Sequence, residues 1–408
     1  MSDMMMYSVY QQVANCVNPW RFYAQSSLGK LDLAHSGSFV LNRSMKAYYE
    51  QISFLGFTHV RPKFGIHEIL DAVGNRYEVE EEVVERSDFC KLLHFKKIGA
   101  KPESKVLLVA PMSGHFATLL SGTVKTLLKD HDVYITDWLN IRDIPIDKGK
   151  FDFDSYVRHI INFLEYLGPQ AHLIGVCQPT VACLVATAVM SEDKHPCLPA
   201  SIVLMAGPID VRNNPTKVND LANEKPISWF KQKLISTVPS QFQGRGRKVY
   251  PGFVQLSAFM SMNLKRHQDS FKRLYELRVA GEDEQAQVIH DFYEEYFAIM
   301  DLPADFYIET IQKIFQDCDL PNGRLTFEGR LVNPKFIKKT FLLTVEGERD
   351  DICGIGQTLA AQDLCSGLPA YMKSHHLQAG VGHYGVFNGK RWESQIYPIV
   401  RNLIQSCN

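Results

Sequence analysis

The sequence predicts an α/β fold, with a mostly parallel central sheet and helices on both faces. Between residues 106 and 206, short apolar runs alternate with longer amphipathic segments, and this pattern resumes at residue 340. Such runs are typical of strands that are buried on both faces and linked by helical crossovers. The long interruption between the two blocks predicts an inserted, largely helical lid.

Residues 1–75 are expected to form an N-terminal helical extension. Their apolar and aromatic side chains recur at helical spacing, which predicts one or more amphipathic helices that cover another part of the protein. After this extension, residues 77–85 and 89–98 are rich in Val, Leu and Phe and are separated by Arg86-Ser87-Asp88. They fit an antiparallel strand pair.

The α/β core is assigned to residues 76–209 and 337–408. Its remaining strands and its helices follow from the alternation of apolar runs and amphipathic segments. The predicted strands are 106–110, 133–136, 171–176, 202–206, 340–345 and 371–377. The predicted helices are 155–167, 179–190 and 392–405.

Residues 210–336 lack the alternation and are assigned to a lid or cap domain, with helical patches interrupted by Pro and Gly. The segment is rich in aromatic residues, most of which are expected to fill the core of the lid itself. A minority are expected to line a substrate groove. These aromatic residues include Trp229, Phe230, Tyr250, Phe253, Phe259, Phe292, Tyr293, Tyr296 and Phe297.

The composition excludes several classes of partner. A formal charge of −1 supplies no net field toward nucleic acid or an anionic membrane. No stretch reaches the roughly 20 apolar residues of a membrane span, and the N-terminus does not read as a signal peptide. The 9 cysteines are an odd number without metal-ligand spacing, which favours reduced thiols and a cytoplasmic protein without zinc.

A strand-turn-helix elbow is predicted at Cys177. The apolar run of residues 171–176 leads directly into Cys177, and a helical pattern begins at Pro179. A nucleophile on such a strained turn needs small residues two positions before and two after it. Gly175 meets this need. Pro179 departs from the usual Gly, although proline suits the first turn of a helix.

An acid and a base follow in the chain order that the α/β-hydrolase fold requires. Asp350 closes a Gly-x-x-Asp turn after the strand of residues 340–345, and it is favoured over its neighbour Asp351. His383 follows the last predicted strand and is the expected base. Among the other histidines, His375 and His376 lie within a strand, and His115 and His172 come too early in the chain. The predicted catalytic triad is therefore Cys177, Asp350 and His383.

Each member of this triad has an expected role. Cys177 lies at a helix N-terminus beside an imidazole, so we expect a thiolate that attacks a carbonyl carbon. Asp350 orients His383, which moves the proton. The oxyanion is expected to bind the backbone N–H groups of Gln178 and Met112. This chemistry needs no cofactor and no metal.

Four segments together resemble the bacterial intracellular polyhydroxybutyrate (PHB) depolymerases. They are residues 109–115 (VAPMSGH), 175–179 (GVCQP), 346–352 (EGERDDI) and 382–387 (GHYGVF). The resemblance implies an enzyme that cleaves ester bonds in the poly(3-hydroxybutyrate) of cytoplasmic storage granules and releases 3-hydroxybutyrate or its oligomers. The thiol nucleophile of that family falls on Cys177, its acid on Asp350 and its base on His383.

Several alternatives stay open. A polyhydroxyalkanoate synthase resembles the same pattern but usually has glycine where this chain has Pro179. A small-ester or thioester hydrolase needs the same triad, whereas a granule-coating protein without activity is disfavoured by it. The sequence leaves open whether water or coenzyme A accepts the acyl group, and whether the chain forms a homo-oligomer.

Overall fold

The computed structural model describes residues 3–33 and 39–407, and its centre is a nine-stranded sheet. The strands of this sheet are β1 (Glu68–Leu70), β2 (Arg76–Arg86), β3 (Cys90–Lys97), β4 (Lys105–Val109), β5 (Asp132–Trp138), β6 (His172–Val176), β7 (Ser201–Met205), β13 (Phe341–Gly347) and β14 (Lys373–Gln378). Their order across the sheet is β1-β2-β3-β5-β4-β6-β7-β13-β14. The last six in this order are parallel, while β1, β2 and β3 are antiparallel at one edge.

The predicted strand pattern is confirmed. The pair predicted at 77–85 and 89–98 is the antiparallel pair β2–β3, and each of the six predicted crossover strands matches one parallel strand. The central strands β4, β6 and β7 are almost fully buried, because helices cover both faces of the sheet. This burial on two sides explains why they read as continuous apolar runs rather than alternating ones.

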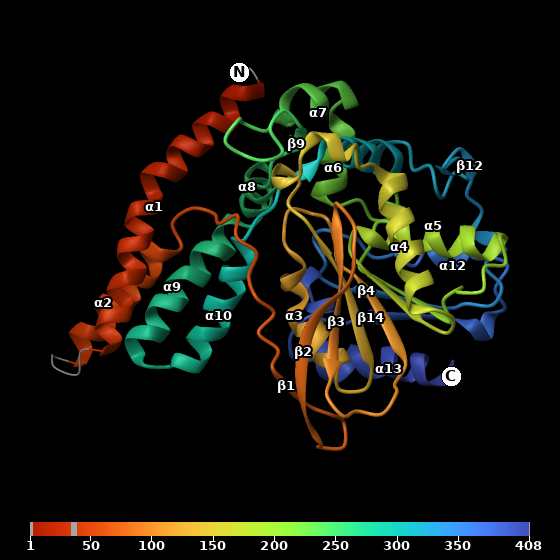
Figure 1. The fold of residues 1–408 in the computed structure, drawn as a ribbon, viewed down its shortest axis with the longest axis horizontal. Coiled ribbons are helices and arrows are strands. Elements are labelled where there is room, and N and C mark those ends of the chain that lie inside the picture. The colour runs from red at the N-terminus through yellow and green to blue at the C-terminus, as the bar shows by residue number, and fades with distance from the viewer. Residues whose placement is uncertain (1–2, 34–38, 408) are drawn as a thin grey trace.

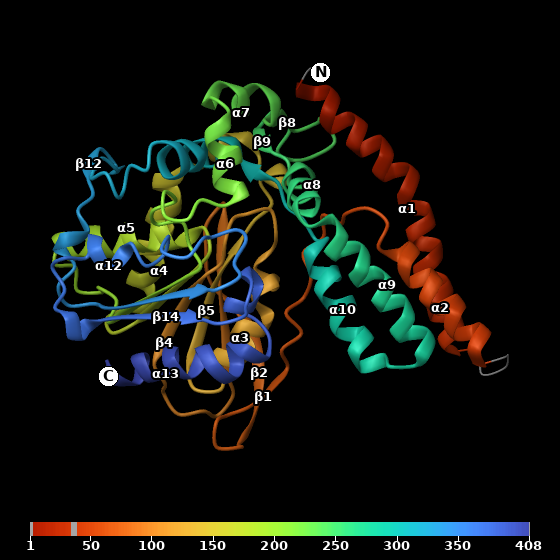
Figure 2. The ribbon, with the colours of Figure 1, turned by 180° about the vertical axis from the view of Figure 1, so that it is seen from behind.

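Helices cover the sheet on both sides, as predicted. α3 (Ser121–Leu127) and α13 (Tyr397–Ser406) lie on one face, and α4 (Phe153–Leu167) and α5 (Pro179–Glu192) lie on the other (Figures 1 and 2). α4 begins at an N-cap, since the Asp152 carboxylate accepts a hydrogen bond of 2.9 Å from the backbone N–H of Ser155. The helix predicted at 392–405 begins as a π-helical turn, η8 (Trp392–Ile396), before α13.

The strand order contains one topological switch. The chain passes from β4 to β5 on one side and then returns to place β6 on the other side of β4. In open α/β sheets, ligands bind outside the carboxyl ends of the strands at such a point. The loops after β4 and β6 meet there. The core connections also include α12 (Ala361–Leu364), η1 (Ala117–Leu120), η2 (Ile141–Asp143), η3 (Ile146–Lys148), η5 (Pro334–Phe336), η6 (Ala370–Met372) and η7 (His383–Val386).

The inserted segment between β7 and β13 is mainly helical but also contains short strands. Its helices are α6 (Lys217–Glu224), α7 (Ile227–Lys233), α8 (Gly252–Met262), α9 (Leu264–Ala280), α10 (Asp283–Tyr296), α11 (Ala304–Glu309) and the π helix η4 (Thr310–Gln316). Its strands are β8 (Ser236–Thr237), β9 (Lys248–Tyr250), β10 (Leu302–Pro303), β11 (Thr326–Phe327) and β12 (Arg330–Leu331). α9 and α10 form a hairpin closed by Gly281, whose φ of 83° is the left-handed value that glycine tolerates.

The N-terminal helix α2 (Phe39–Ser53) packs against this hairpin, and α1 (Asp3–Leu33) packs against α2 and the segment around β8 and α8, rather than against the sheet (Figures 1 and 2). The guanidinium of Arg278 on α9 lies 2.9 Å from the buried carboxylate of Glu50 on α2. The Gln51 amide also donates to the carbonyl of Phe271, at 3.1 Å. The predicted covering role of the N-terminal helices is confirmed, and the part that they cover is the lid.

Of the nine lid aromatics singled out from the sequence, six are buried. Four of the six belong to a second hydrophobic cluster beside the main core, to which α1 contributes Tyr7, whereas Phe230 and Tyr250 belong to the main core. The division into an extension, a core and a lid at residues 75/76, 209/210 and 336/337 stays a prediction, and β1 at residues 68–70 belongs to the sheet. The six buried residues of that set are Phe230, Tyr250, Phe253, Tyr293, Tyr296 and Phe297, and Phe306 and Phe327 of the same segment are buried as well.

Candidate active site

The turn between β6 and α5 forms a strained elbow at Cys177. The φ angle of Cys177 is 65°, a left-handed conformation that is uncommon for a residue with a side chain. The backbone N–H of Cys177 donates to the carbonyl of Met205 at 2.8 Å, and its carbonyl accepts from the Thr180 hydroxyl at 2.9 Å. The elbow is thereby held from both sides, and the Cys177 side chain is partly exposed.

Gly175 permits the close approach of strand and helix that the elbow needs. A Cβ atom at this position would lie 2.9 Å from the Cys183 sulfur and 3.3 Å from the Thr180 Cα. Any larger residue would therefore push α5 away from β6. Pro179 occupies the first turn of α5, where its missing N–H needs no partner, in agreement with the expectation for this departure from glycine.

Asp350 and His383 form a buried pair on neighbouring loops. The Nδ1 atom of His383 lies 2.8 Å from Oδ2 of Asp350, whose side chain is fully buried. The other carboxylate oxygen accepts hydrogen bonds from the backbone N–H groups of Ile352 and Cys353, at 2.9 and 2.8 Å. Asp350 is thus fixed before any substrate binds, and it is this residue rather than Asp351 that contacts His383.

The surroundings of His383 favour its charged form. Burial lowers the pKa of the imidazole, but the charge and hydrogen bonds of Asp350 and Cys177 outweigh burial and raise the pKa well above its ordinary value. Cys177, Asp350 and His383 therefore act on one another in the folded protein, although they come from three distant parts of the chain.

The other histidines lie in structural positions. His375 and His376 lie on β14, as expected, and His172 contacts the Ser201 hydroxyl at 2.8 Å. His115 is buried and stacks on Tyr296, and burial lowers its pKa to about 4. It follows that His115 is neutral at physiological pH.

The two predicted oxyanion donors come from adjacent loops, and one of them already has a partner. The backbone N–H of Met112 donates to the side-chain oxygen Oε1 of Gln178 at 3.4 Å. Gln178 is buried, and among the described residues its Nε2 atom has no hydrogen-bond partner. The amide oxygen of Gln178 therefore lies where a substrate oxyanion would receive the Met112 N–H, a contact that the sequence does not indicate.

Glu346 is a supporting residue that motif reasoning missed. Its buried carboxylate accepts backbone hydrogen bonds of 2.8 to 3.0 Å from Gly356, Thr358 and Leu359. These bonds hold residues 356–359 against the end of β13. Glu346 itself lies only four residues before Asp350 in the sequence. A carboxylate inside an apolar strand is the sequence signal that marks such a role.

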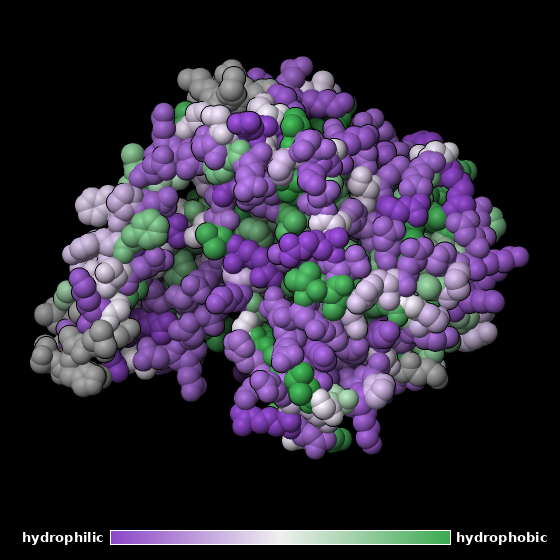
Figure 3. Space-filling model, in the orientation of Figure 1, coloured by the Kyte–Doolittle hydropathy of each residue, from purple (hydrophilic) through white to green (hydrophobic). Residues whose placement is uncertain are grey.

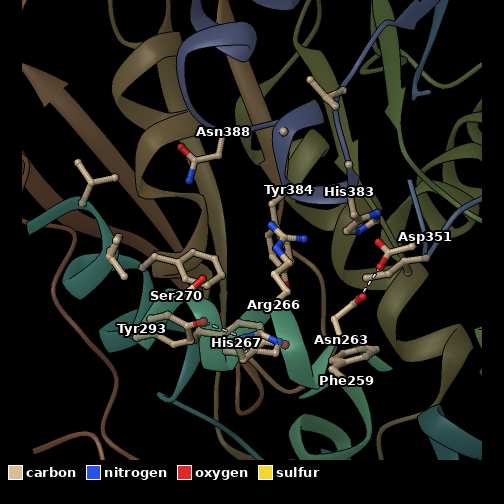
Figure 4. A pocket seen from close by; sticks show the side chains of 18 of the residues that line it. Phe259, Asn263, Arg266, His267, Ser270, Tyr293, Asp351, His383, Tyr384 and Asn388 are labelled. Carbon is tan, nitrogen blue, oxygen red and sulfur yellow. Dashed lines mark hydrogen bonds between the residues drawn. The ribbon is translucent and has the colours of Figure 1, made fainter. Parts of the chain in front are cut away.

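A cavity of about 580 Å³ lies beside His383, between the α9–α10 hairpin and the loop of residues 380–391. Figure 4 shows His383, Tyr384 and Asp351 on one side, with Arg266, His267 and Tyr293 of the lid facing them. The Asn263 amide of the lid donates to the Asp351 carboxylate at 2.5 Å. The lid is therefore tied to the loop that carries Asp350. Four of the lid aromatics, Phe259, Phe292, Tyr293 and Tyr296, line this cavity, and their role in a substrate groove stays a prediction.

The described residues contain one group with metal-ligand chemistry, His290, Asp291 and Glu294 on the surface of α10. Exposed acidic residues of this kind are common without an ion, and the triad chemistry makes no use of them. Within the described residues, no helix is both long enough and apolar enough to cross a membrane.

A largely parallel sheet, a left-handed turn at Cys177 between β6 and α5, and an acid and a histidine that follow it in chain order define the α/β-hydrolase class. Residues 206–408 match the model of the family described as "PHB de-polymerase C-terminus". The chain belongs to this PHB depolymerase family and is a hydrolase. A comparison with curated proteins gives no match.

Solved structures with a similar arrangement are distant in sequence. A 2-hydroxy-6-oxo-6-phenylhexa-2,4-dienoate hydrolase from Rhodococcus sp. strain RHA1 is 11% identical (TM-score 0.45), covering 81% of this chain and 99% of its own. A meta-cleavage product hydrolase from Pseudomonas fluorescens IP01 is 16% identical (TM-score 0.42; 84% and 98% covered). A thermophilic esterase from Thermogutta terrifontis is 12% identical (TM-score 0.40; 83% and 98% covered).

Proposed function

We propose that the protein is a poly(3-hydroxybutyrate) depolymerase that cleaves the ester bonds of the polymer through a Cys177–Asp350–His383 triad. Its main support is the left-handed elbow that carries Cys177 next to an imidazole fixed by a buried carboxylate. Membership of the PHB depolymerase family supports this choice of substrate. A thiol, an imidazole and a carboxylate in this relation can run acyl transfer without a cofactor.

The reaction proceeds in two balanced steps. The Cys177 thiolate attacks the ester carbonyl, and the carbon–oxygen bond breaks as His383 gives its proton to the leaving alkoxide. An acyl thioester on Cys177 and a free hydroxyl group result. Water then attacks the thioester while His383 accepts one of its protons, and the carboxylic acid leaves as Cys177 becomes a thiolate again; the acid then releases its own proton to solvent. Asp350 keeps Nδ1 of His383 engaged throughout, so that Nε2 does the proton transfer.

The oxyanion of each step would bind the backbone N–H groups of Gln178 and Met112. Both belong to rigid turns at the switch point of the sheet, which is the preorganisation that such stabilisation needs. Coenzyme A is an alternative acceptor of the acyl group, because His383 can activate a thiol as well as water.

The physiological substrate would be the amorphous polymer of cytoplasmic storage granules. A formal charge of −1 suits a neutral polyester better than a polyanion. The hydrogen bond between Asn263 and Asp351 ties the lid to the loop that carries Asp350. The lid would therefore cover the site, and a single polymer chain could enter it from the granule.

Incubation of the protein with amorphous granules, with and without coenzyme A, and mass analysis of the products tests this function. We expect 3-hydroxybutyrate or its oligomers in the first case. Cys177→Ala should abolish their release, whereas Cys407→Ser, at a partly exposed cysteine near the C-terminus, should not. Iodoacetamide should label Cys177 in parallel with the loss of activity. Polymer degradation by Cys177→Ala at the parent rate, or polymer synthesis from hydroxybutyryl-CoA, would overturn the proposal.

A further inference from the structure

The cavity beside His383 has a distinctive relation to the triad. His383 lines its wall, whereas Cys177 does not. In ester cleavage the histidine must give its proton to the oxygen of the leaving alcohol, so that oxygen has to lie within hydrogen-bond reach of the imidazole. A cavity that opens onto His383 but not onto the nucleophile is therefore placed for the leaving half of the substrate. Its volume of about 580 Å³ lies in the range of small-molecule sites.

The charged side chains of this cavity are mainly basic. Arg266 comes from the lid, and Lys390 and Arg391 come from the loop after His383. One carboxylate, that of Asp351, also lines the wall, but it already accepts the Asn263 amide. The pKa of His267, the remaining lining histidine outside the triad, is lowered by burial and by the charge of Arg266, which keeps its ring neutral.

Arg266 is the best placed of the three basic residues. Figure 4 shows its side chain reaching from α9 toward Tyr384, the neighbour of His383. Burial raises the pKa of Tyr384, and the Arg266 charge acts in the opposite direction, which places the guanidinium close to this phenol. Among the described residues, neither the Arg266 guanidinium nor the Lys390 ammonium has a hydrogen-bond or ion-pair partner. Arg391 donates to the carbonyl of Ala379 at 2.6 Å.

A polyester of hydroxy acids has two different ends, a neutral hydroxyl group and a carboxylate. Only the carboxyl end carries charge at neutral pH, and a guanidinium binds a carboxylate through a planar fork of donors. An interior segment of the polymer offers no charge to Arg266 or Lys390. If the enzyme cut chains at random positions, Arg266 and Lys390 would therefore have no charged group of the substrate to bind.

We propose that this cavity is a binding subsite for the carboxylate end of the polyester chain, with Arg266 and Lys390 as its specificity-determining residues. This inference rests on the proposed function and deepens it. The acyl part of the chain becomes attached to Cys177, and the unit that ends in the carboxylate leaves from the cavity after it takes a proton from His383. The enzyme then shortens chains from the carboxyl end and releases small hydroxy acids.

The test uses two forms of a 3-hydroxybutyrate tetramer whose hydroxyl end is blocked as a methyl ether. One form has a free carboxylate, and the other has it converted to a methyl ester. We expect kcat/KM to be about 10- to 100-fold higher for the free acid, the effect of a hydrogen bond to a charged group. The first products should be the carboxyl-terminal short acid and the complementary blocked fragment.

Variants separate the subsite from general effects of charge. Arg266→Gln and Lys390→Gln should each lower kcat/KM for the free acid and leave the methyl ester unaffected. Lys265→Gln removes the same charge one residue earlier on α9, outside the cavity, and should change neither substrate. Arg266→Glu should reverse the preference.

Two outcomes would overturn the inference: equal kcat/KM of the parent enzyme for both tetramers, or an equal loss for both in Arg266→Gln. Either would leave the proposed function intact, because ester cleavage would still occur. Failure of the parent enzyme to cleave either tetramer, or granules, would instead reject the proposed function.

Discussion

At the residue scale, the side chain of Gln178 occupies part of the site that it helps to build. Its backbone N–H is an expected oxyanion donor, while its amide oxygen accepts the N–H of the other donor, Met112, at 3.4 Å. This distance is long for a hydrogen bond, so the contact is weak and a developing oxyanion should displace it. The Gln178 side chain therefore competes with the substrate for the Met112 N–H, and displacing it costs the folded protein little stability.

Substitutions at Gln178 can separate these two roles. Gln178→Ala keeps the backbone donor and removes the competing oxygen, so kcat/KM on a soluble ester should stay equal or rise by a few fold. Gln178→Glu places a negative charge against the oxyanion, and its effect should approach the loss of one donor, about 10²- to 10³-fold in kcat. Steady-state kinetics of both variants measures this. A large loss in Gln178→Ala would mean that the amide itself assists the reaction.

Asp350 sets the charge of His383. Asp350→Asn keeps the burial, which lowers the pKa of His383, and removes the carboxylate, which raises it, so this pKa should fall. In the parent protein the ion pair of Asp350 and His383 stabilises the fold fully below the ordinary histidine pKa of about 6.5. This contribution is lost as the pH rises through the raised pKa of His383 in the folded protein. The variant should therefore be least stable, relative to the parent, at acidic to neutral pH.

An NMR titration of the imidazole, with thermal unfolding at pH 6 and at alkaline pH, checks this expectation. Asp351→Asn is the matched control, since Asp351 is exposed and contacts Asn263 rather than His383. The same fall in the pKa of His383 in both variants would contradict the assigned role of Asp350.

At the element scale, Tyr7 of α1 makes a buried polar contact with Asp301 of the inserted segment. The Tyr7 hydroxyl donates to the carboxylate of Asp301 at 2.6 Å, and the Gly252 N–H donates to the other oxygen at 2.9 Å. Burial raises the pKa of Asp301, and the bond from Tyr7 partly offsets this. The start of α8, the strand β10 and α1 all meet at this carboxylate.

Tyr7→Phe should therefore destabilise the fold. It leaves a buried carboxylate without one of its donors, which costs about 1–3 kcal/mol. Urea unfolding gives the measurement. Tyr48→Phe, at a ring on α2 that is 60% exposed, should stay within about 0.5 kcal/mol of the parent. Equal stability of the two variants would show that the contact to Asp301 contributes nothing.

The sequence predicts elements well where one local signal decides them. The strands β4, β6 and β7 are buried on both faces, so each stands out as a short apolar run. The lid gives no such signal, because its helices pack on segments far away in the chain, as α9 packs on α2 and Phe253 stacks on Tyr10. Its existence could be predicted, but its short strands and its partners could not.

The same limit applies to the candidate site. Cys177, Asp350 and His383 each follow a predicted strand in a fixed order, so chain order and turn chemistry indicate them. The contact of Gln178 with Met112 and the cluster of basic residues around Arg266 depend on how loops distant in sequence are placed relative to one another, and no motif links these loops. Residue types alone do not indicate which of these loops lie close together in space.

At the scale of the whole molecule, the outer face of α1 is apolar and open. Val9, Val13, Trp20 and Tyr23 recur with Cys16 at spacings of three and four, and Trp20 and Tyr23 are 66% and 60% exposed. Tyr7 and Ala24 lie outside this stripe and are buried. In Figure 3, pale and green side chains interrupt the hydrophilic surface on the side of α1 and α2. An enzyme that works on an insoluble polyester needs such a face for adsorption.

Replacing this face should weaken adsorption without changing chemistry. The double substitution Trp20→Ser and Tyr23→Ser should lower the affinity for amorphous granules by about 10-fold or more, since burial of each ring contributes roughly 1.5–3 kcal/mol. Because the stripe belongs to α1 and the triad to the core, kcat/KM for a soluble ester should not change. Phe22→Ser removes a ring that is 68% exposed but lies off the stripe, and it should adsorb like the parent. Co-sedimentation with granules measures the affinity, and an equal loss in Phe22→Ser would show that adsorption follows exposed apolar area rather than this helix face.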